Sequence, residues 1–214
     1  MFSQKEEGIK PQFVLWRICL YKHLKKQTMK ISKILSVALV AFTMLTGSAS
    51  FAQKTKMVGG AAMYPTKNII QNAVNSKDHT TLVAAVKAAG LVETLEGKGP
   101  FTVFAPTNAA FDKLPKGTVE TLVKPENKKM LTTILTYHVV SGKWSAADIA
   151  AGIKKGNGKY TAKTVQGGTL TFMMDGKDIW IMDEKGGKSK ITIADVNQSN
   201  GVIHVVDTVL MPKS

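Results

Sequence analysis

Residues 99–111 read GPFTVFAPTNAAF. Phe101 begins a run of aromatic and β-branched residues, a composition that favours a strand. Pro106 ends that run, because proline has no backbone N–H with which to continue a strand ladder. Thr107 can then cap a short helix that buries Phe111. We therefore expect a strand that leads through a sharp turn into a helix.

A second informative stretch, SNGVIHVVDTVLMP, covers residues 199–212. Asn200 and Gly201 predict a tight turn, and the alternating residues that follow them predict a strand. We expect His204 to be a hydrogen-bonded residue of this strand rather than a metal ligand. Asp207 in this stretch, and Asn108 in the first one, are expected to accept hydrogen bonds from backbone N–H groups near the turns.

The rest of the chain divides into a helical half and a strand-rich half. Helical periodicity predicts short helices between residues 68 and 151, with Asp78 and Ser145 as N-caps. In the C-terminal half, glycines separate short alternating runs, and Asp175-Gly176 is typical of a hairpin turn. Segregated helices and strands indicate an α+β fold with a mostly antiparallel sheet, rather than a doubly wound parallel sheet.

The two stretches, together with the Tyr137-His138 pair between them, resemble the fasciclin domain family, in which such segments bracket the domain. The resemblance covers residues 65–212. It implies a fasciclin-like α+β fold, with a small antiparallel β-wedge or sandwich and helices packed on one side. It also implies adhesion or matrix association rather than catalysis. The residues that would form the structural signature of the family are Phe101, Pro106, Thr107, Asn108, Phe111, Asn200, Gly201, His204 and Asp207.

The same resemblance gives three partner-binding candidates, Tyr137, His138 and Asp195. In animal relatives the Tyr-His pair is associated with integrin-mediated adhesion, and an acidic motif with Glu-Pro ahead of Asp-Ile lies upstream of the final segment. This chain reads IADV at residues 193–196, so the aspartate is present and Glu-Pro is missing. A structural role for the pair stays open, because a histidine between a helix and a strand can hold that joint by hydrogen bonds.

Residues 29–52 have the parts of a secretory signal peptide. Lysines follow Met29, an apolar run covers residues 34–45, and small residues precede a cleavage site after Ala52. The apolar run is shorter than the roughly 20 residues that a membrane-spanning helix needs. We therefore expect an exported protein that works in the periplasm or outside the cell.

This export segment also sets the expected domain boundaries. We interpret residues 1–28 as a misassigned translation start or a leader extension. Residues 53–64 are expected to be a flexible lead-in, and residues 65–212 a single fasciclin-like domain. The mature form would then keep no stable membrane anchor.

The exported portion is rich in lysine. The whole chain has 29 basic and 15 acidic residues, of which 21 lysines and 13 acidic residues follow Ala52, a net charge of +8. The single arginine and the single cysteine both precede Met29. Nucleic acid is disfavoured as a partner, because specific base recognition relies on arginine. The charge suits a protein or an acidic surface or matrix component, while a merely soluble surface stays an alternative.

No catalytic, metal-binding or cofactor-binding residues are expected. After Ala52 the chain has no cysteine nucleophile and no Gly-x-Ser-x-Gly elbow. His79, His138 and His204 stand far apart in the sequence, without the spacing of a zinc site. Asp183-Glu184 is the one adjacent carboxylate pair after Ala52, and we expect it in a solvated turn. The chain is therefore interpreted as non-enzymatic.

A carrier of an apolar small ligand is the alternative function. Some fasciclin-type domains hold pigments, so the resemblance admits a carotenoid or a lipid as ligand. A place in the core is the alternative for apolar residues that would line a surface, because alternation along a strand puts half of them inside and methionine commonly fills gaps in cores. The residues that either line such a surface or form the core are Trp144, Phe172, Met173, Met174, Trp180 and Met182.

Overall fold

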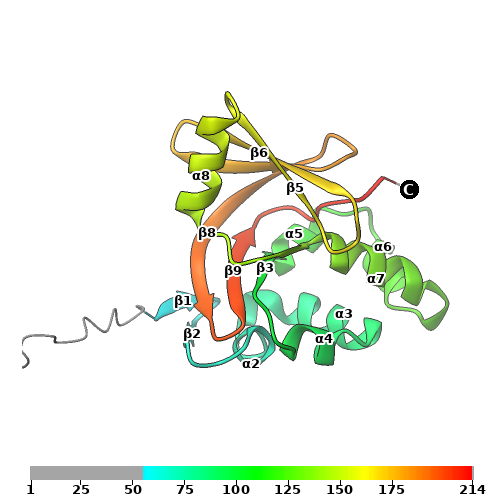
Figure 1. The fold of residues 1–214 in the computed structure, drawn as a ribbon. Coiled ribbons are helices and arrows are strands. Elements are labelled where there is room, and N and C mark those ends of the chain that lie inside the picture. The colour runs from blue at the N-terminus through cyan, green and yellow to red at the C-terminus, as the bar shows by residue number, and fades with distance from the viewer. Residues whose placement is uncertain (1–54, 214) are drawn as a thin grey trace, which may run out of the picture. The chain divides into compact units, whose positions relative to one another are not determined.

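The computed structural model describes residues 55–213 (Figure 1). The segments interpreted as a leader extension and a signal peptide, residues 1–28 and 29–52, lie outside the described residues. Within the described part, helices dominate the first half and strands the second, as the sequence predicts. The α+β fold class is confirmed.

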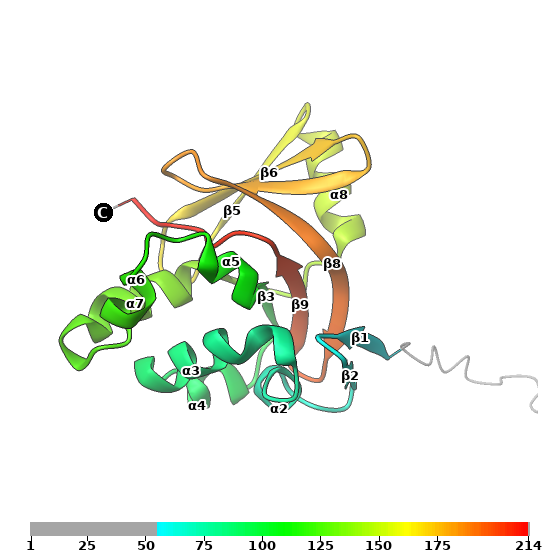
Figure 2. The same ribbon diagram turned by 180° about the vertical axis from the view of Figure 1, so that it is seen from behind.

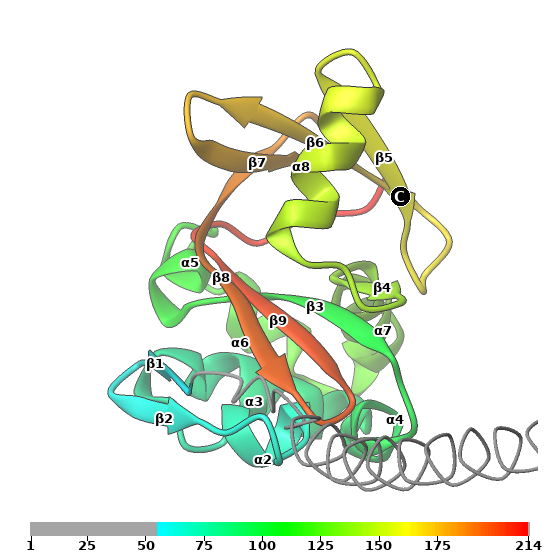
Figure 3. The ribbon, with the colours of Figure 1, turned by 60° about the vertical axis from the view of Figure 1, so that its left-hand side comes forward.

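Most of the helices precede Val139, and they gather at one end of the domain (Figure 2). The exception is α8 (Ala146–Lys155), which lies beside strands at the other end (Figure 3). The helices of the first group are α2 (Ile69–Ala73), η1 (Lys77–His79), α3 (Thr80–Ala89), α4 (Val92–Glu96), α5 (Asn108–Asp112), α6 (Thr118–Leu122), η2 (Pro125–Asn127) and α7 (Lys128–Tyr137). None of the helices between residues 55 and 213 is long and apolar enough to cross a bilayer.

A seven-stranded sheet connects the two ends of the domain, with the strand order β4-β3-β9-β8-β7-β6-β5. The last five strands of the chain form an antiparallel meander, in agreement with the predicted hairpins. The strands are β3 (Phe101–Pro106), β4 (Val139–Ser141), β5 (Lys159–Lys163), β6 (Thr169–Asp175), β7 (Asp178–Met182), β8 (Lys188–Gln198) and β9 (Gly201–Val206).

One pairing departs from an all-antiparallel sheet. β3 and β9, the strands of the two signature stretches, run parallel from Phe101↔Gly201 to Pro106↔Val206. Every residue of β9 is buried, as is every residue of β3 after the first. The two stretches, about 100 positions apart in the sequence, therefore form two adjacent interior strands of the sheet.

The two edge strands of the sheet also approach each other. An isolated bridge joins Val140 of β4 to Thr164, the residue after β5. The backbone N–H of Val165 donates to the carbonyl of Val139 over 2.8 Å. Because an unpaired edge is a template for unwanted strand pairing, these contacts protect part of both edges.

The expected lead-in requires a correction. Residues 53–64 are predicted to be flexible, yet Lys56–Val58 (β1) and Ala61–Met63 (β2) pair as an antiparallel hairpin. Gly59 and Gly60 form its turn with φ of 57° and 75°, the left-handed backbone that a two-residue hairpin turn of this kind requires. The last residue of each strand is buried in the core, so apolar contacts hold the hairpin in place.

The core has two parts. The first lies between the helices of the first group and one face of β3 and β9, and includes Leu82, Leu135 and Val205. The second lies between α8 and the meander, and includes Ile149 and Phe172. Each part covers a different region of the sheet, and β8 and β9 contribute residues to both.

Local capping signals predict two helix starts correctly and one wrongly. Thr107 accepts a hydrogen bond from the N–H of Ala110 at the start of α5, and Ser145 forms a capping box with Asp148 at the start of α8. Asp78 is not an N-cap. It lies inside η1, and α3 begins after His79 without a side-chain cap from that residue.

Candidate functional site

Tyr137 lies at the end of α7 and is fully buried, with 0% of its surface exposed. Its hydroxyl donates to the carbonyl of Thr169 over 2.8 Å and accepts from the N–H of Glu184 over 3.1 Å. Burial raises the pKa of Tyr137 to about 12. The phenol therefore stays protonated and ties α7 to the meander.

His138 follows Tyr137 and is also buried. Its Nδ1 lies 2.8 Å from the carbonyl of Ile134, and its Nε2 accepts from the N–H of Leu210 over 3.0 Å. These partners place the proton on Nδ1 and require a neutral ring. Desolvation lowers the pKa of His138 to about 4. Both ring nitrogens are thus used inside the domain, where they join α7 to the C-terminal segment.

Asp195, the third partner-binding candidate, lies at an irregularity in β8. The pairing of β8 with β9 shifts register on each side of Ile193, and Asp195 has φ of 53°. Its Oδ1 accepts from the N–H of Ala146 over 2.7 Å, at the start of α8. A carboxylate at this position satisfies an N-terminal N–H group and interacts favourably with the helix dipole. Asp195 therefore anchors α8 to β8.

His204 completes the same connection from β9. Its Nδ1 accepts from the N–H of Asp195 over 3.3 Å, and its Nε2 lies 2.8 Å from the carbonyl of Trp144. The ring stacks on Phe104 of β3 with centroids 5.7 Å apart. Desolvation lowers the pKa of His204, so the ring is neutral with its proton on Nε2. His204 thus connects β9 to the segment before α8.

The asparagines of the two stretches have similar roles. Asn108 accepts from the N–H of Thr81 over 3.0 Å and donates to the carbonyl of Lys77 over 2.9 Å, so it supplies the helix-start contact that Asp78 does not make. Asn200 accepts from the N–H of Ile69 over 3.1 Å. The amide of Asn200 also donates to two carbonyls at the end of α4. Each asparagine therefore joins segments that are far apart in the sequence.

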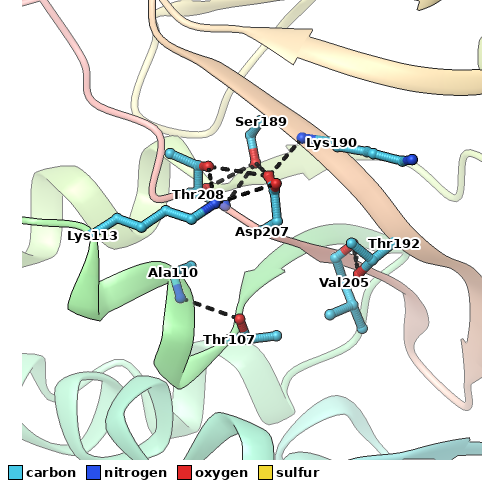
Figure 4. Close-up of polar contacts among 9 residues, drawn as sticks. All are labelled: Thr107, Ala110, Lys113, Ser189, Lys190, Thr192, Val205, Asp207 and Thr208. Atoms are coloured by element: carbon cyan, nitrogen blue, oxygen red, sulfur yellow. Dashed lines mark hydrogen bonds and ion pairs between the residues drawn. The ribbon is translucent and has the colours of Figure 1, made fainter.

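Asp207 lies directly after β9 at the centre of a polar cluster (Figure 4). Its Oδ1 accepts from the N–H of Lys190 over 2.8 Å, and its Oδ2 lies 3.3 Å from Nζ of Lys113. Desolvation alone would raise the pKa of Asp207. The hydrogen bonds from Lys190, Lys113 and Thr208 and the charge of Lys113 outweigh that effect, so the pKa is lowered.

The environment of Asp183 differs from the one that the sequence predicts. Asp183 is expected in a solvated turn, but only 7% of its surface is exposed. Its Oδ1 accepts from the N–H groups of Lys185 and Gly187, and its Oδ2 accepts from the N–H of Met211. The carboxylate therefore organises the turn between β7 and β8 and binds it to the C-terminal segment. The Asp183-x-x-x-Gly187 spacing around a glycine turn is the signal that indicates such a role.

The six apolar candidates do not form one common surface. Phe172 is fully buried in the second part of the core, whereas Met174 is 41% exposed near the β6–β7 turn. Trp144 is partly buried and packs against Tyr160 with ring centroids 5.3 Å apart. The remaining three side chains, Met173, Trp180 and Met182, lie on the face of the meander opposite Phe172 and are partly buried.

An apolar cavity of about 80 Å³ lies in the helical half of the domain. Its walls come mainly from α2, α3, α4 and β3, and include Leu82 and Val86. His79 also lines it, with Nδ1 2.9 Å from Oγ of Ser76, and among the described residues its Nε2 makes no hydrogen bond of good geometry. Desolvation lowers the pKa of His79, although the carbonyl of Ala105 nearby opposes the fall. The ring is therefore neutral.

The remaining polar groups do not form a metal centre within residues 55–213, where no three His, Cys, Asp or Glu side chains lie together. The signature side chains instead hold segments of the fold in place. The geometry thus defines a class of protein: an α+β domain whose two signature strands pair in parallel and whose signature polar residues fasten helices to the sheet.

Comparison with known proteins identifies the family. The model of the Fasciclin domain matches residues 77–212. The chain belongs to the fasciclin domain family.

Curated bacterial proteins are similar to most of this chain. Protein sll1483 of Synechocystis is 46% identical over 186 residues, which cover 81% of this chain and 96% of that protein. Immunogenic protein MPB70 of Mycobacterium bovis is 38% identical over 145 residues, 65% of this chain and 66% of that protein. Cell surface glycolipoprotein MPB83 of the same species is 36% identical over 160 residues, 72% of this chain and 64% of that protein.

A solved structure supports the same fold. The FAS1 domain pair of the insect cell adhesion molecule fasciclin I superposes with a TM-score of 0.61 at 16% sequence identity. The matched region covers 68% of this chain and 51% of that chain, so this chain spans about half of the insect domain pair. At this identity the likeness concerns the fold alone.

Proposed function

We propose that this chain is an exported, non-enzymatic adhesion module that binds a cell-surface component, a matrix component or another protein. The observation that carries the proposal is the fasciclin match over residues 77–212, a family known for adhesion and interaction. Two similarities agree with it. One relative is described as a cell surface glycolipoprotein, and the related solved structure belongs to an insect cell adhesion molecule.

The use of the buried polar residues supports a non-enzymatic role. General acid–base catalysis needs a group that can reach a substrate and exchange a proton with it. His138 and His204 have both ring nitrogens engaged with backbone groups, and each is buried. Asp183 and Asp195 likewise accept from backbone N–H groups. These residues therefore hold the fold together.

Surface charge supports a protein or an acidic surface or matrix component as the partner, and it disfavours nucleic acid. Residues after Ala52 carry a net charge of +8 without any arginine. Among the described residues, ion pairs occupy only Lys113 and Lys190, so most lysines remain available to attract an acidic surface. We further propose that a signal peptide ends at Ala52, and its removal would release the protein to the periplasm or the cell exterior with no stable membrane anchor.

The experiment is a retention assay on surface material from the cells that produce the protein. Purified chain is incubated with isolated cell-wall and matrix fractions, and an unrelated domain of equal size and of net charge +8 serves as the control. The proposal predicts saturable retention above that control. Retention equal to that of the control domain would refute adhesion, because it would mean that nonspecific charge attraction alone holds the chain.

The second candidate function is the carrier of an apolar small ligand, and the cavity beside α3 is the observation that favours it. Its volume of about 80 Å³ is well below the roughly 150 Å³ at which an engineered apolar cavity takes up benzene. A carotenoid or a lipid chain would therefore need the helices around the cavity to move apart. Organic extraction of protein purified from its own host tests this candidate, and a colourless extract without lipid would reject it.

A further inference from the structure

We infer that the outer face of the meander, on strands β5 to β8, is a binding surface for an acidic polysaccharide. This inference rests on the proposed function, because it names the surface and the chemical class of the partner. We define the outer face by six residues, Lys159, Thr171, Met173, Trp180, Met182 and Lys188.

Strand register places these residues side by side. Met173 of β6 lies directly opposite Lys159 of β5 on one side and Trp180 of β7 on the other. Met182 of β7 lies opposite Thr171 of β6 and Lys188 of β8. Because neighbouring strands are about 4.8 Å apart, the two rows span the four strands over roughly 14 Å. The outer face thus has an apolar centre with a lysine on each side.

The opposite face of the same strands is closed by the core. Phe172 and Ile181 alternate with the outer residues, are fully buried, with 0% of their surface exposed, and pack with Ile149 of α8. Figure 3 shows α8 beside β5 and β6. The outer lysines are exposed and the outer tryptophan and methionines are partly buried, so apolar surface remains accessible on this face.

Charge on the outer face selects an acidic occupant. Of the lysines on these strands, Lys190 pairs with Asp178, with Nζ and Oδ2 2.6 Å apart, near the β6–β7 turn. Among the described residues, Lys159 and Lys188 make no ion pair with a carboxylate. Two unpaired ammonium groups therefore flank the apolar centre, and they complement carboxylates at intervals along a linear polymer.

The apolar centre favours a polysaccharide over a lipid surface. A pyranose ring presents C–H groups on its faces and hydroxyl groups at its rim, so one face can stack on the indole of Trp180 while Thr171 meets the hydroxyls. An interfacial membrane site needs several protruding apolar side chains. The outer face has a single aromatic residue, which is partly buried, and carries the Asp178 carboxylate at one end.

The test is a calorimetric titration of the purified chain with polygalacturonate, a linear polymer of uronic acid. Neutral dextran and vesicles of phosphatidylglycerol and phosphatidylcholine are titrated in parallel. The test variant is Lys159→Gln/Lys188→Gln, and the matched control is Lys116→Gln/Lys124→Gln, which removes the same charge from exposed sites on the helical half. A Trp180→Thr variant keeps a good strand former and removes the ring.

The inference predicts that polygalacturonate binds and dextran does not. The test pair should weaken the affinity by about fivefold or more, since each lysine contributes on the scale of an exposed charge contact. The control pair should change the affinity for polygalacturonate by less than about twofold. Trp180→Thr should weaken the part of the binding that persists at high salt, because salt screens the lysine contacts and leaves the stacking contact. Circular dichroism confirms that each variant is folded.

Three results would overturn the inference: no binding of polygalacturonate, equal weakening by the control pair, or vesicle binding of equal affinity that depends on Trp180. Retention on matrix fractions without polygalacturonate binding would reject the outer face and leave the proposed function standing. If the chain neither binds polygalacturonate nor is retained on matrix fractions, the outer face and the proposed function are both rejected.

Discussion

Nε2 of His138 accepts a hydrogen bond from the backbone N–H of Leu210 over 3.0 Å, across 72 positions of sequence. The same ring contacts the carbonyl of Ile134 one turn earlier in α7. A neutral imidazole thus fastens the helical half to the C-terminal segment. This contact gives the Tyr137-His138 pair a structural role and makes the stability of the domain sensitive to pH.

Stability should fall as the pH is lowered through the window set by His138. Its pKa is about 4 in the folded protein, below the ordinary value of 6.5 that applies to the unfolded chain. Between these values the unfolded chain binds a proton that the folded protein does not. The contribution of His138 to the free energy of unfolding is therefore complete above pH 6.5 and is lost toward pH 4. The loss from this residue between pH 7.0 and pH 4.5 is about 2 kcal/mol, and urea unfolding at these two pH values measures it.

A His138→Gln variant is the control for that prediction. The glutamine amide can still accept from Leu210 but does not titrate. The variant should be less stable at pH 7 and should lose less stability on acidification than the wild type. An unchanged pH dependence would assign the effect to other groups, such as His79 and His204, whose pKa values are also lowered by desolvation.

Removal of the Tyr137 hydroxyl should affect stability and leave adhesion intact. Tyr137→Phe leaves the N–H of Glu184 and the carbonyl of Thr169 without their partner, at a cost of about 1–3 kcal/mol. Because the ring is buried, retention on matrix fractions should equal that of the wild type at temperatures where the variant is folded. Lost retention by a folded variant would instead support the adhesive role suggested by animal relatives.

The two residues of the Asp207–Lys113 ion pair should contribute unequally to the stability of the fold. Asp207→Ala removes the acceptor of the Lys190 N–H and should cost about 2 kcal/mol. Lys113→Ala removes a partner whose side chain is 52% exposed, so it should cost less than about 1 kcal/mol. Thermal or urea unfolding of both variants measures the difference, and equal losses would show that the ion pair itself is what matters.

Gly201 should tolerate no side chain. A Cβ at Gly201 would overlap the backbone carbonyl of Phe101 in the adjacent parallel strand, and strain of this kind costs about 3 kcal/mol. Gly60→Ala is the comparison, because Gly60 has φ of 75° but open space around it, and strain alone should cost about 1 kcal/mol there. Equal unfolding free energies for the two variants would argue against close packing of β3 and β9.

The parts of the fold that local sequence encodes could be predicted. Thr107 and Ser145 cap the helices that directly follow them, and Asp175-Gly176 lies at the turn between β6 and β7. The α+β class follows from the same local patterns. Gly59-Gly60 also indicates a hairpin, but two three-residue strands give too short an alternation to be recognised without their contact with the core.

Features that depend on distant residues could not be predicted locally. The start of α3 is held by Asn108, 27 positions beyond Thr81, so the nearby Asp78 is a misleading signal. Asp183 lies in a stretch whose composition is typical of a solvated turn, but its carboxylate also accepts from the N–H of Met211, 28 positions further along the chain. The family resemblance identifies the signature residues. Their structural roles become clear only from contacts between segments that are far apart in the sequence.

Saturable retention on the native cell-surface and matrix fractions distinguishes an adhesion module from a basic domain that is held by charge alone. Purified chain is titrated onto these fractions beside a size-matched domain of the same net charge, and the bound fraction is measured at low and high salt. An adhesion module should give a binding curve that saturates and exceeds the control at both salt concentrations. Binding that matches the control, and that disappears with it at high salt, would contradict the assignment of this fasciclin domain as an adhesion module.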